Sequence, residues 1–173
     1  MTRQVNAIVA VDDQWGIGKD GTMPWPHLRE DLKRFKKLTD DSVIVMGKNT
    51  WLSLPKRPLP NRDNVIVTRT LGQEQDSDFA IKVSGDPKAI ITKLKQTFDG
   101  DIWIIGGADI YRQFLPFCNS VYITRIHDDY ECDTRFPTAI LERYFMLDYT
   151  ENSILDNDVE THYEIWEKHD ILN

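Results

Sequence analysis

Residues 102–108, Ile102-Trp103-Ile104-Ile105-Gly106-Gly107-Ala108, predict a buried strand that turns directly into a helix. Four consecutive apolar residues are typical of a parallel strand that is covered on both faces. The two glycines have no side chain, so the backbone there can turn sharply and can approach a ligand closely. A second stretch, Val43-Ile44-Val45-Met46-Gly47-Lys48, follows the same pattern. Both stretches therefore predict central strands of an α/β sheet.

The rest of the chain alternates strand and helix patterns. Strands are expected at residues 5–11, 42–46, 64–68, 80–83, 102–105 and 120–126, and helices at 29–38, 48–54, 87–98 and 108–114. Pro87 suits a first helical position, with Asp86 or Ser84 as its cap. In the tail, residues 144–153 and 160–168 flank a turn cluster, Asp156-Asn157-Asp158, and predict an antiparallel hairpin.

These patterns together predict one domain over residues 1–173. Its class is α/β, with a mixed, mostly parallel central sheet of about eight strands, helices on both faces and an antiparallel C-terminal hairpin. A chain of 173 residues is long enough to bury a substantial core.

Composition narrows the class of function. The net charge of −7 argues against nucleic acid as a partner, and no apolar run approaches the length of a membrane span. Two cysteines, Cys118 and Cys132, form neither a disulfide framework nor a metal-binding spacing, which fits a reduced, cytoplasmic setting. We therefore expect a cytoplasmic protein with no membrane or nucleic-acid partner.

The charge is unevenly distributed along the chain. Residues 29–69 hold ten Lys and Arg against five Asp and Glu, whereas residues 126–173 hold three against 13. A positive segment in an acidic protein suggests a local site for an anionic small ligand. Solvated helix charge is the alternative explanation, and it accounts for some of the lysines in the first helix.

Turns at the ends of three expected strands could bind phosphate. Gly106-Gly107-Ala108 and Gly47-Lys48-Asn49-Thr50 each join a strand to a helix, whose N-terminus favours an anion. Thr68-Arg69 ends the strand at 64–68. Lys48 and Arg69 together could hold a phosphate monoester such as the ribose 2′-phosphate of NADP. Each turn alone is weak evidence, and a full GxGxxG fingerprint is absent.

Asp31 is the principal candidate for a catalytic acid. It follows a glycine-rich loop, residues 16–21, and a stretch stiffened by Pro24 and Pro26. It also lies beside an apolar stripe of the first helix, in which Leu28, Leu32 and Phe35 share one face that is expected to be buried. A carboxylate on the buried side of a helix is rare unless something requires it. A first-turn acid that favours the helix dipole is the alternative, and this helix alone does not decide between them.

Blocks along almost the whole chain, about residues 5–168, resemble the dihydrofolate reductase family in that family's order. They are residues 6–11, 16–19, 23–26, 45–51, 57–62, 104–107, 110–111 and 133–137. The resemblance implies NADPH-dependent reduction of 7,8-dihydrofolate to 5,6,7,8-tetrahydrofolate, which supports one-carbon and thymidylate metabolism. Hydride would pass to C6 while N5 gains a proton. It also implies a monomer that binds antifolates such as methotrexate and needs no metal.

The resemblance assigns the substrate pocket. The Asp31 carboxylate would bind the pteridine 2-amino and N3 positions and promote protonation of N5, while Glu30 would face solvent. Arg62 would grip the α-carboxylate of the glutamate tail. The implied catalytic residues are Asp31, Trp25, Tyr111 and Thr124. The implied substrate-binding residues are Ile8, Val9, Asp31, Leu32, Phe35, Leu54, Arg62 and Ile105.

The resemblance also assigns the NADPH site and a lid, residues 16–23, which Asp133 would pin by hydrogen bonding. The implied cofactor-binding residues are Ala10, Ile17, Gly18, Met23, Gly47, Lys48, Asn49, Thr50, Thr68, Arg69, Gly106, Gly107, Ala108, Asp109 and Ile110. Asp109 departs from some members, which place a basic or small residue there; we expect it to face the helix N-terminus rather than the phosphates. Trp15 either shields the nicotinamide ring or anchors the lid.

Two other functions stay open. One is a reductase of the riboflavin-pathway type on the same fold, which Asp31 and Arg62 argue against. The other is a catalytically silent folate- or nucleotide-binding protein, which the joint presence of Asp31, Trp25 and Tyr111 argues against. Trp51, Trp103 and Trp166 are expected to pack in the core or on the sheet. The four histidines show no metal-binding arrangement.

Overall fold

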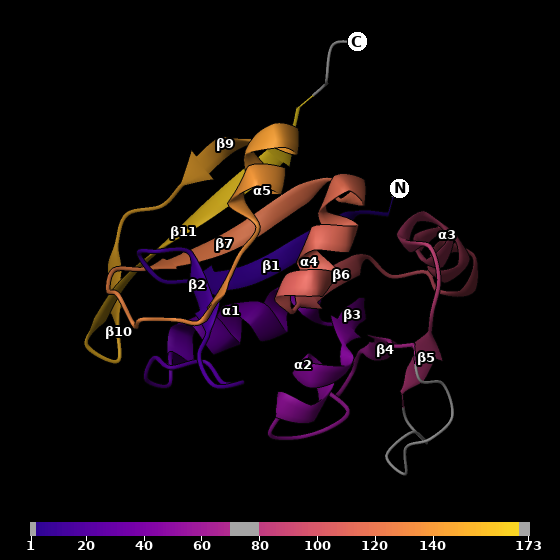
Figure 1. The fold of residues 1–173 in the computed structure, drawn as a ribbon, viewed down its shortest axis with the longest axis horizontal. Coiled ribbons are helices and arrows are strands. Elements are labelled where there is room, and N and C mark those ends of the chain that lie inside the picture. The colour runs from indigo at the N-terminus through magenta and orange to yellow at the C-terminus, as the bar shows by residue number, and fades with distance from the viewer. Residues whose placement is uncertain (1–2, 70–79, 170–173) are drawn as a thin grey trace.

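The computed structural model describes residues 3–69 and 80–169, and within them nine strands form one twisted sheet (Figure 1). These strands are β1 (Val5–Val11), β3 (Val43–Gly47), β4 (Asp63–Val67), β5 (Ile81–Val83), β6 (Ile102–Gly106), β7 (Ser120–Ile126), β9 (Phe145–Thr150), β10 (Ile154–Asp156) and β11 (Val159–Lys168). Their order is β10-β11-β7-β1-β6-β3-β4-β5, with β9 paired to β11 off this path.

Six of these strands, in the order β7-β1-β6-β3-β4-β5, run parallel to one another. Strand β11 pairs antiparallel with β7, and both β9 and β10 pair antiparallel with β11. The prediction of a mixed, mostly parallel sheet is confirmed, and the six strands of its parallel part match the expected ranges to within one residue.

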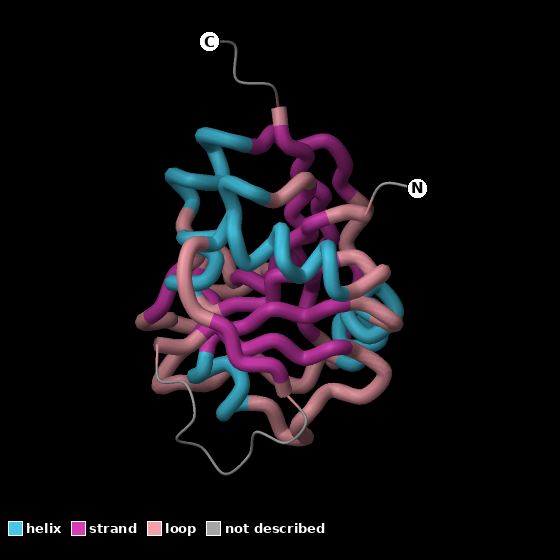
Figure 2. The backbone as a smooth tube through the Cα atoms, turned by 90° about the vertical axis from the view of Figure 1, so that its right-hand side faces the viewer, coloured by secondary structure: helices cyan, strands magenta, loops and turns pink. Residues whose placement is uncertain are grey.

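Helices cover both faces of the sheet, as predicted (Figure 2). They are α1 (Arg29–Thr39), α2 (Lys48–Ser53), α3 (Pro87–Thr97), α4 (Ala108–Phe114) and α5 (Thr138–Tyr144), with a short 3₁₀ turn, η2 (Leu115–Phe117). The Asp86 side chain accepts the amide of Ala89 at 3.1 Å and caps α3, which settles the two candidates for that cap.

Strand β1 shows how the two faces are divided. Ala7, Val9 and Val11 point into a core shared with α3, α4 and the residues of α5. Ile8 points the other way, into a smaller core with Trp51 and Trp103 that Phe35 of α1 completes. Because successive side chains of a strand alternate, one apolar strand serves both layers. Trp51 and Trp103 are core residues, as expected.

The C-terminal region differs in detail from the predicted hairpin. The first predicted arm, residues 144–153, is divided into β9 and a separate β10. The tight turn is Asn157-Asp158, with φ values of 51° and 62°. Two consecutive positive φ values define a type I′ turn, which asparagine and aspartate tolerate. Asp156 therefore belongs to the end of β10 rather than to the turn.

Helix α5 and a small two-stranded ladder were also not expected from the sequence. Helix α5 follows Pro137, and the two-stranded ladder of β2 (Gly16–Gly18) and β8 (Thr134–Arg135) lies outside the main sheet. Strands of two or three residues carry too little periodicity to be detected. Within the described ranges, no helix is long and apolar enough to cross a membrane.

Candidate functional site

Two glycine turns meet at the carboxyl edge of the sheet. Strands β3 and β6 are neighbours, and Met46 is in register with Gly106. A Cβ added to Gly47 would lie 3.0 Å from Ile110 Cγ1, and one added to Gly107 would lie 3.7 Å from Thr50 Oγ1. The starts of α2 and α4 therefore lie side by side. Ligands of open α/β sheets bind outside such strand ends.

Gly106 cannot be replaced by a larger residue without strain. Its φ is +114°, and an added Cβ would lie 3.1 Å from the Tyr111 hydroxyl oxygen. The Gly106–Gly107 peptide bond is cis. The Gly106-Gly107 turn therefore exposes backbone atoms without side chains just before α4. Ala108, the first residue of α4, is half-buried.

Basic and hydroxyl side chains follow the neighbouring strands at the same edge. Gly47 pairs in register with Val67, so Lys48 and Thr68 each come one residue beyond that pair. Arg69 comes next and is exposed, as is Asn49 in the first turn of α2. Lys48 and Arg69, the cations that the sequence suggested as phosphate ligands, therefore follow the ends of two neighbouring strands.

Asp31 lies in the first turn of α1, and Thr124 lies on β7. The Thr124 hydroxyl donates a hydrogen bond of 2.6 Å to Asp31 Oδ1. Burial raises the pKa of Asp31, and the bond from Thr124 and the charge of Arg34 partly oppose this shift. The side chain is thus a carboxyl poised to hold a proton. Neighbouring Glu30 is exposed and pairs with Lys33 at 3.6 Å.

Tyr111 joins α4 to the central strand. Its hydroxyl donates a 2.7 Å hydrogen bond to the Ile8 carbonyl, and its ring meets the Phe136 ring edge-on at 5.1 Å. The side chain is buried, and burial raises its pKa. This contact fixes the edge of β1 that carries Ile8 and Val9, both buried, and Ala10, which is half-buried.

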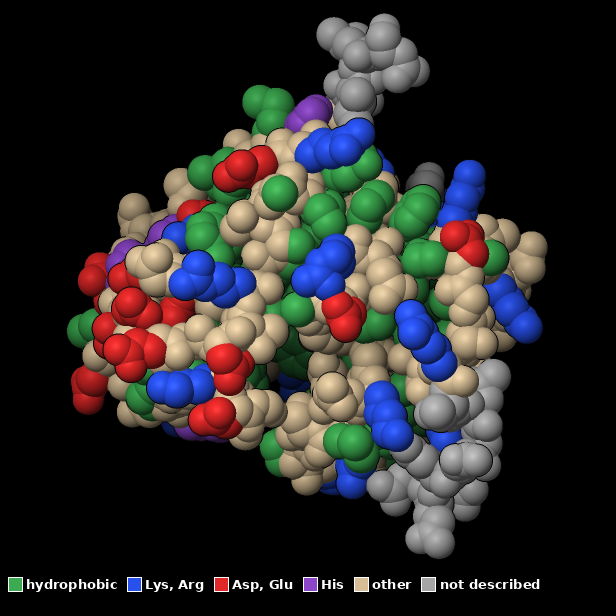
Figure 3. Space-filling model, in the orientation of Figure 1, with side chains coloured by type: hydrophobic (Ala, Val, Ile, Leu, Met, Phe, Trp, Pro, Cys, Tyr) green, Lys and Arg blue, Asp and Glu red, His purple; other side chains and the backbone are tan. Residues whose placement is uncertain are grey.

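Apolar side chains line the space between α1 and α2. Phe35, Leu54 and Ile105 are half-buried and pack on the smaller core. Leu28 and Leu32 were expected to share a buried face, but Leu28 is 3% exposed and Leu32 is 42% exposed. Figure 3 shows a hollow with hydrophobic side chains at its floor below α4, between α1 and α2. Acidic side chains gather on the side of β10, and basic ones gather over α2 and α3.

Arg62 is held in place beside Phe35 by two hydrogen bonds. Its Nε donates to the Pro60 carbonyl at 2.9 Å, and its Nη1 donates to Thr39 Oγ1 at 3.0 Å. Its Cζ lies 5.8 Å from the Phe35 ring centroid. Partial burial lowers its pKa, but a guanidinium remains charged at any physiological pH. Its remaining N–H groups form a fork that suits a carboxylate.

The loop that carries Ile17, Gly18 and Met23 is tied at several points. Asp133 Oδ2 accepts the Asp20 amide at 2.8 Å, which is the hydrogen bond that the resemblance implied. Ile17 and Gly18 lie in β2, and Met23 is 61% exposed.

Trp15 anchors this loop. Its ring stacks on Phe136 at 6.2 Å and meets Trp166 edge-on at 6.4 Å, and Arg125 Cζ lies 4.2 Å from its centroid. These contacts hold it against the core, so anchoring is the interpretation that the packing supports. Trp25 lies beyond the loop, where its ring meets that of Tyr130 edge-on at 5.9 Å.

Two buried carboxylates beside the candidate site residues were missed by the sequence analysis. Asp12 is fully buried and accepts the amides of Gly16 and Tyr130 at 2.7 and 3.0 Å, so it ties the loop to the β7–β8 connection. Asp156 is 3% exposed and accepts the amides of Glu30 and Asp31. The partners of both residues are up to 126 positions away, and no local pattern signals such bonds.

The carboxylate of Asp109 is paired with Arg112, one turn further along α4. The expected direction, toward the helix N-terminus, is therefore not what the structure shows. Its charge is balanced locally. Elsewhere, His127 and His162 lie in contact, with 2.6 Å between Nε2 and Nδ1. Among the described residues, no group of three or more His, Cys, Asp or Glu could hold a metal ion.

Fold and site together define an α/β enzyme with two ligand regions that meet at the carboxyl ends of its parallel strands. A family model described as dihydrofolate reductase matches residues 4–168. Dihydrofolate reductase of Rattus norvegicus is 33% identical across 98% of this chain and 100% of its own length. That of Bacillus subtilis is 37% identical across 77% of this chain and 75% of its own length.

A solved structure of dihydrofolate reductase from Enterococcus faecalis, complexed with NADP(H) and RAB-propyl, shares the fold. Its TM-score is 0.86, and it is 30% identical over 96% of this chain and 97% of that one. The chain belongs to the dihydrofolate reductase family, and it is an oxidoreductase whose cofactor is NADPH.

Proposed function

We propose that this chain reduces 7,8-dihydrofolate to tetrahydrofolate through the residues assigned above, with Asp31 controlling the proton that reaches N5. The observation that carries this proposal is the partly buried carboxyl of Asp31, which accepts a hydrogen bond of 2.6 Å from the Thr124 hydroxyl. When bound, NADPH supplies the hydride that C6 of the substrate accepts. The residues of this chain bind the substrate and the cofactor, orient their rings and exclude water from the site.

Asp31 has two tasks in this proposal. Its carboxyl binds the 2-amino and N3 positions of the pterin, a pairing that fixes the ring plane. Its raised pKa keeps a proton available near the ring at higher pH than an exposed aspartate would. Thr124 orients the carboxyl, Trp25 is assigned to hold a water beside it, and the carbonyls of Ile8 and Ile105 line the pocket.

The glycine turns fit a dinucleotide. Gly47 and Gly106 leave no room for a side chain, so backbone amides at the starts of α2 and α4 can face phosphate oxygens. The proposed phosphate contacts come from Lys48, Thr50, Thr68 and Arg69. The ring of Tyr111 and the backbone of Ala10 are assigned to the nicotinamide end. These features support NADPH over NADH.

Neutralising the phosphate-binding cations should separate the two nicotinamide cofactors. The double variant Lys48→Gln with Arg69→Gln is expected to raise KM for NADPH roughly tenfold, because charge-assisted contacts to the 2′-phosphate are lost. KM for NADH should change little. Lys93→Gln, an exposed lysine of α3, is the matched control. Equal losses for both cofactors would contradict the assignment.

The proposal is tested directly by the loss of NADPH near-ultraviolet absorbance on addition of dihydrofolate, with and without methotrexate. Rapid oxidation that methotrexate stops is the expected result. Tight methotrexate binding without oxidation would favour the silent binding protein. An absence of both signals would direct the next assay to a riboflavin-type substrate.

The same proposal covers a single domain over residues 1–173, a monomer and a cytoplasmic location. One chain supplies every residue assigned to the site, which supports the monomer. Cys118 and Cys132 are both free thiols, which supports a reducing compartment. Sedimentation of the purified chain at micromolar concentration would detect a dimer.

A further inference from the structure

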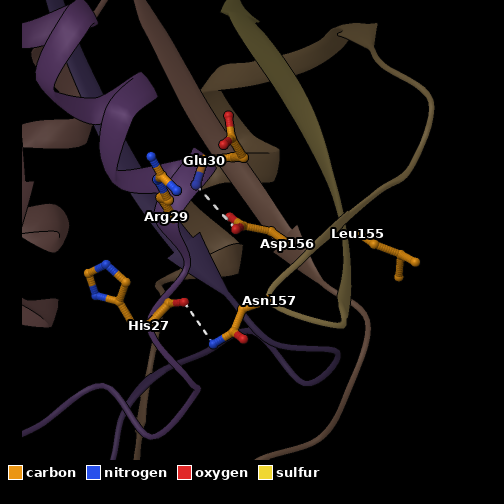
Figure 4. Close-up of a pocket in the computed structure, with 6 residues that line it drawn as sticks. All are labelled: His27, Arg29, Glu30, Leu155, Asp156 and Asn157. Carbon is orange, nitrogen blue, oxygen red and sulfur yellow. Dashed lines mark hydrogen bonds between the residues drawn. The ribbon is translucent and has the colours of Figure 1, made fainter.

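The start of helix α1 is capped by a residue from the opposite end of the chain. Leu28 stands at the N-cap position and makes no side-chain cap bond. The carboxylate of Asp156, at the end of β10, instead accepts the amides of Glu30 and Asp31 at 3.2 and 3.0 Å. Figure 4 shows the bond from the Glu30 amide. Asp156 is 3% exposed. The first amides of a helix have no partner within it, so a buried acceptor there has a large influence on where the helix begins.

A third bond ties the same hairpin to the same segment. The Asn157 side chain donates to the His27 carbonyl at 3.1 Å, and Figure 4 shows this bond beside the one from the Glu30 amide to Asp156. The three bonds fix residues 27–31 against the end of the sheet. The backbone of Asp31 is therefore held by Asp156, while its side chain is held by Thr124.

We propose that Asp156 is a positioning residue for the reductase, which places the Asp31 carboxyl through the Asp31 amide. This inference rests on the proposed role of Asp31. It assigns a role in the reaction to the β10–β11 hairpin, which contains neither the glycine turns nor the residues that pack on the smaller core.

The charge of Asp156 adds a second effect. The ionisable groups that act on Asp31 are Arg34 on its own helix, which lowers its pKa, and Asp156 on β10, which raises it. Burial is the largest cause of the rise, and Thr124 on β7 opposes it through its hydrogen bond. Tyr163 on β11 faces the same group, and burial, with the charges of Asp31 and Asp156, raises the pKa of Tyr163 to about 12. Tyr163 thus stays neutral, so Asp156 is the negative charge that favours the protonated form of Asp31.

The test is Asp156→Asn, which keeps the shape of the side chain and removes its charge. We expect kcat for dihydrofolate to fall roughly three- to tenfold at neutral pH, because the acid is displaced and ionises more readily. The high-pH limb of the kcat profile should move down by about half a pH unit. KM for NADPH should not change. Asp158→Asn removes the same charge from an exposed position two residues away and should leave the profile in place.

Asp156→Glu is the second variant, because it retains the charge and moves the carboxylate away from the two amides. It should lower kcat while leaving the high-pH limb where the wild type has it, and it serves if the asparagine variant fails to fold. A lower melting temperature with kcat and pH profile unchanged would overturn the inference and leave Asp156 a structural cap. If the wild type is active and Asp156→Asn has the same kcat and pH profile as Asp158→Asn, this inference alone is overturned. A wild type that does not oxidise NADPH with dihydrofolate overturns the proposed function as well.

Discussion

Replacing Asp31 by asparagine should lower kcat for dihydrofolate at pH 7 by roughly 10²- to 10⁴-fold, while folding and NADPH binding persist. Asparagine can still accept the hydrogen bond that Thr124 donates, so the local geometry is retained. What is lost is a group that holds and releases a proton beside N5. Turnover measured from pH 5 to 9 should recover partly in acid, where the substrate arrives already protonated.

The pH dependence of the wild type follows from the same group. Burial raises the pKa of Asp31, so its proton is kept below that raised value and lost as the pH rises through it. Activity should therefore fall on the high-pH side in the wild type. In Asp31→Asn the limb set by Asp31 should be lost, and activity should instead fall from low pH as the substrate loses its own proton. Glu30→Gln is the matched control, since Glu30 is the adjacent acid and is exposed. An Asp31→Asn variant that remains fully active at neutral pH would show that the assignment is wrong.

Arg62→Leu should raise KM for dihydrofolate roughly 10- to 100-fold and leave KM for NADPH unchanged. The Arg62 guanidinium is held by Pro60 and Thr39 before any ligand arrives, so little side-chain freedom is lost when it grips a carboxylate. Leucine removes the charged fork, and with it the contact of the guanidinium with the Phe35 ring. Steady-state kinetics at saturating NADPH measure the effect.

The specificity of the Arg62 effect can be checked with the substrate itself. A pterin that lacks the glutamate tail should be reduced equally well by the wild type and by Arg62→Leu. Arg143→Leu, at an exposed position of α5, controls for loss of one positive charge. An unchanged KM for dihydrofolate in Arg62→Leu would mean that the tail is held elsewhere.

Much of the central sheet was predictable from sequence, because its signals are local. Runs such as residues 43–46 and 102–105 are apolar at every position, since strands buried on both faces need no polar alternation. The glycine turns were predictable for the same reason. Their convergence follows from strand order, since parallel strands place their carboxyl ends at one edge.

The missing parts depend on distant partners. Helix α5 is seven residues long, and β2 and β8 together have five, so their patterns are too short to recognise. Asp12 and Asp156 look like ordinary polar residues until the fold brings amides to them. Asp31 is the intermediate case. Its position in the first turn of the helix was predictable from local sequence, but its partner Thr124 lies 93 residues away, and only the resemblance implied a role for Thr124.

The small ladder of β2 and β8 lies outside the main sheet, so ligand access and the geometry of the site depend on different elements. Strand β1 is hydrogen-bonded on both sides, to β6 and β7, so the amides that border the hollow exchange with solvent mainly through global unfolding. The β2–β8 ladder joins two short strands outside that sheet and can break by local fluctuation. Substitutions in this ladder could therefore change how quickly ligands enter and leave without altering the thermodynamic stability of the domain. Substitutions in the ladder and in the main sheet should thus change two properties independently: the residence time of ligands and the positioning of the reacting groups.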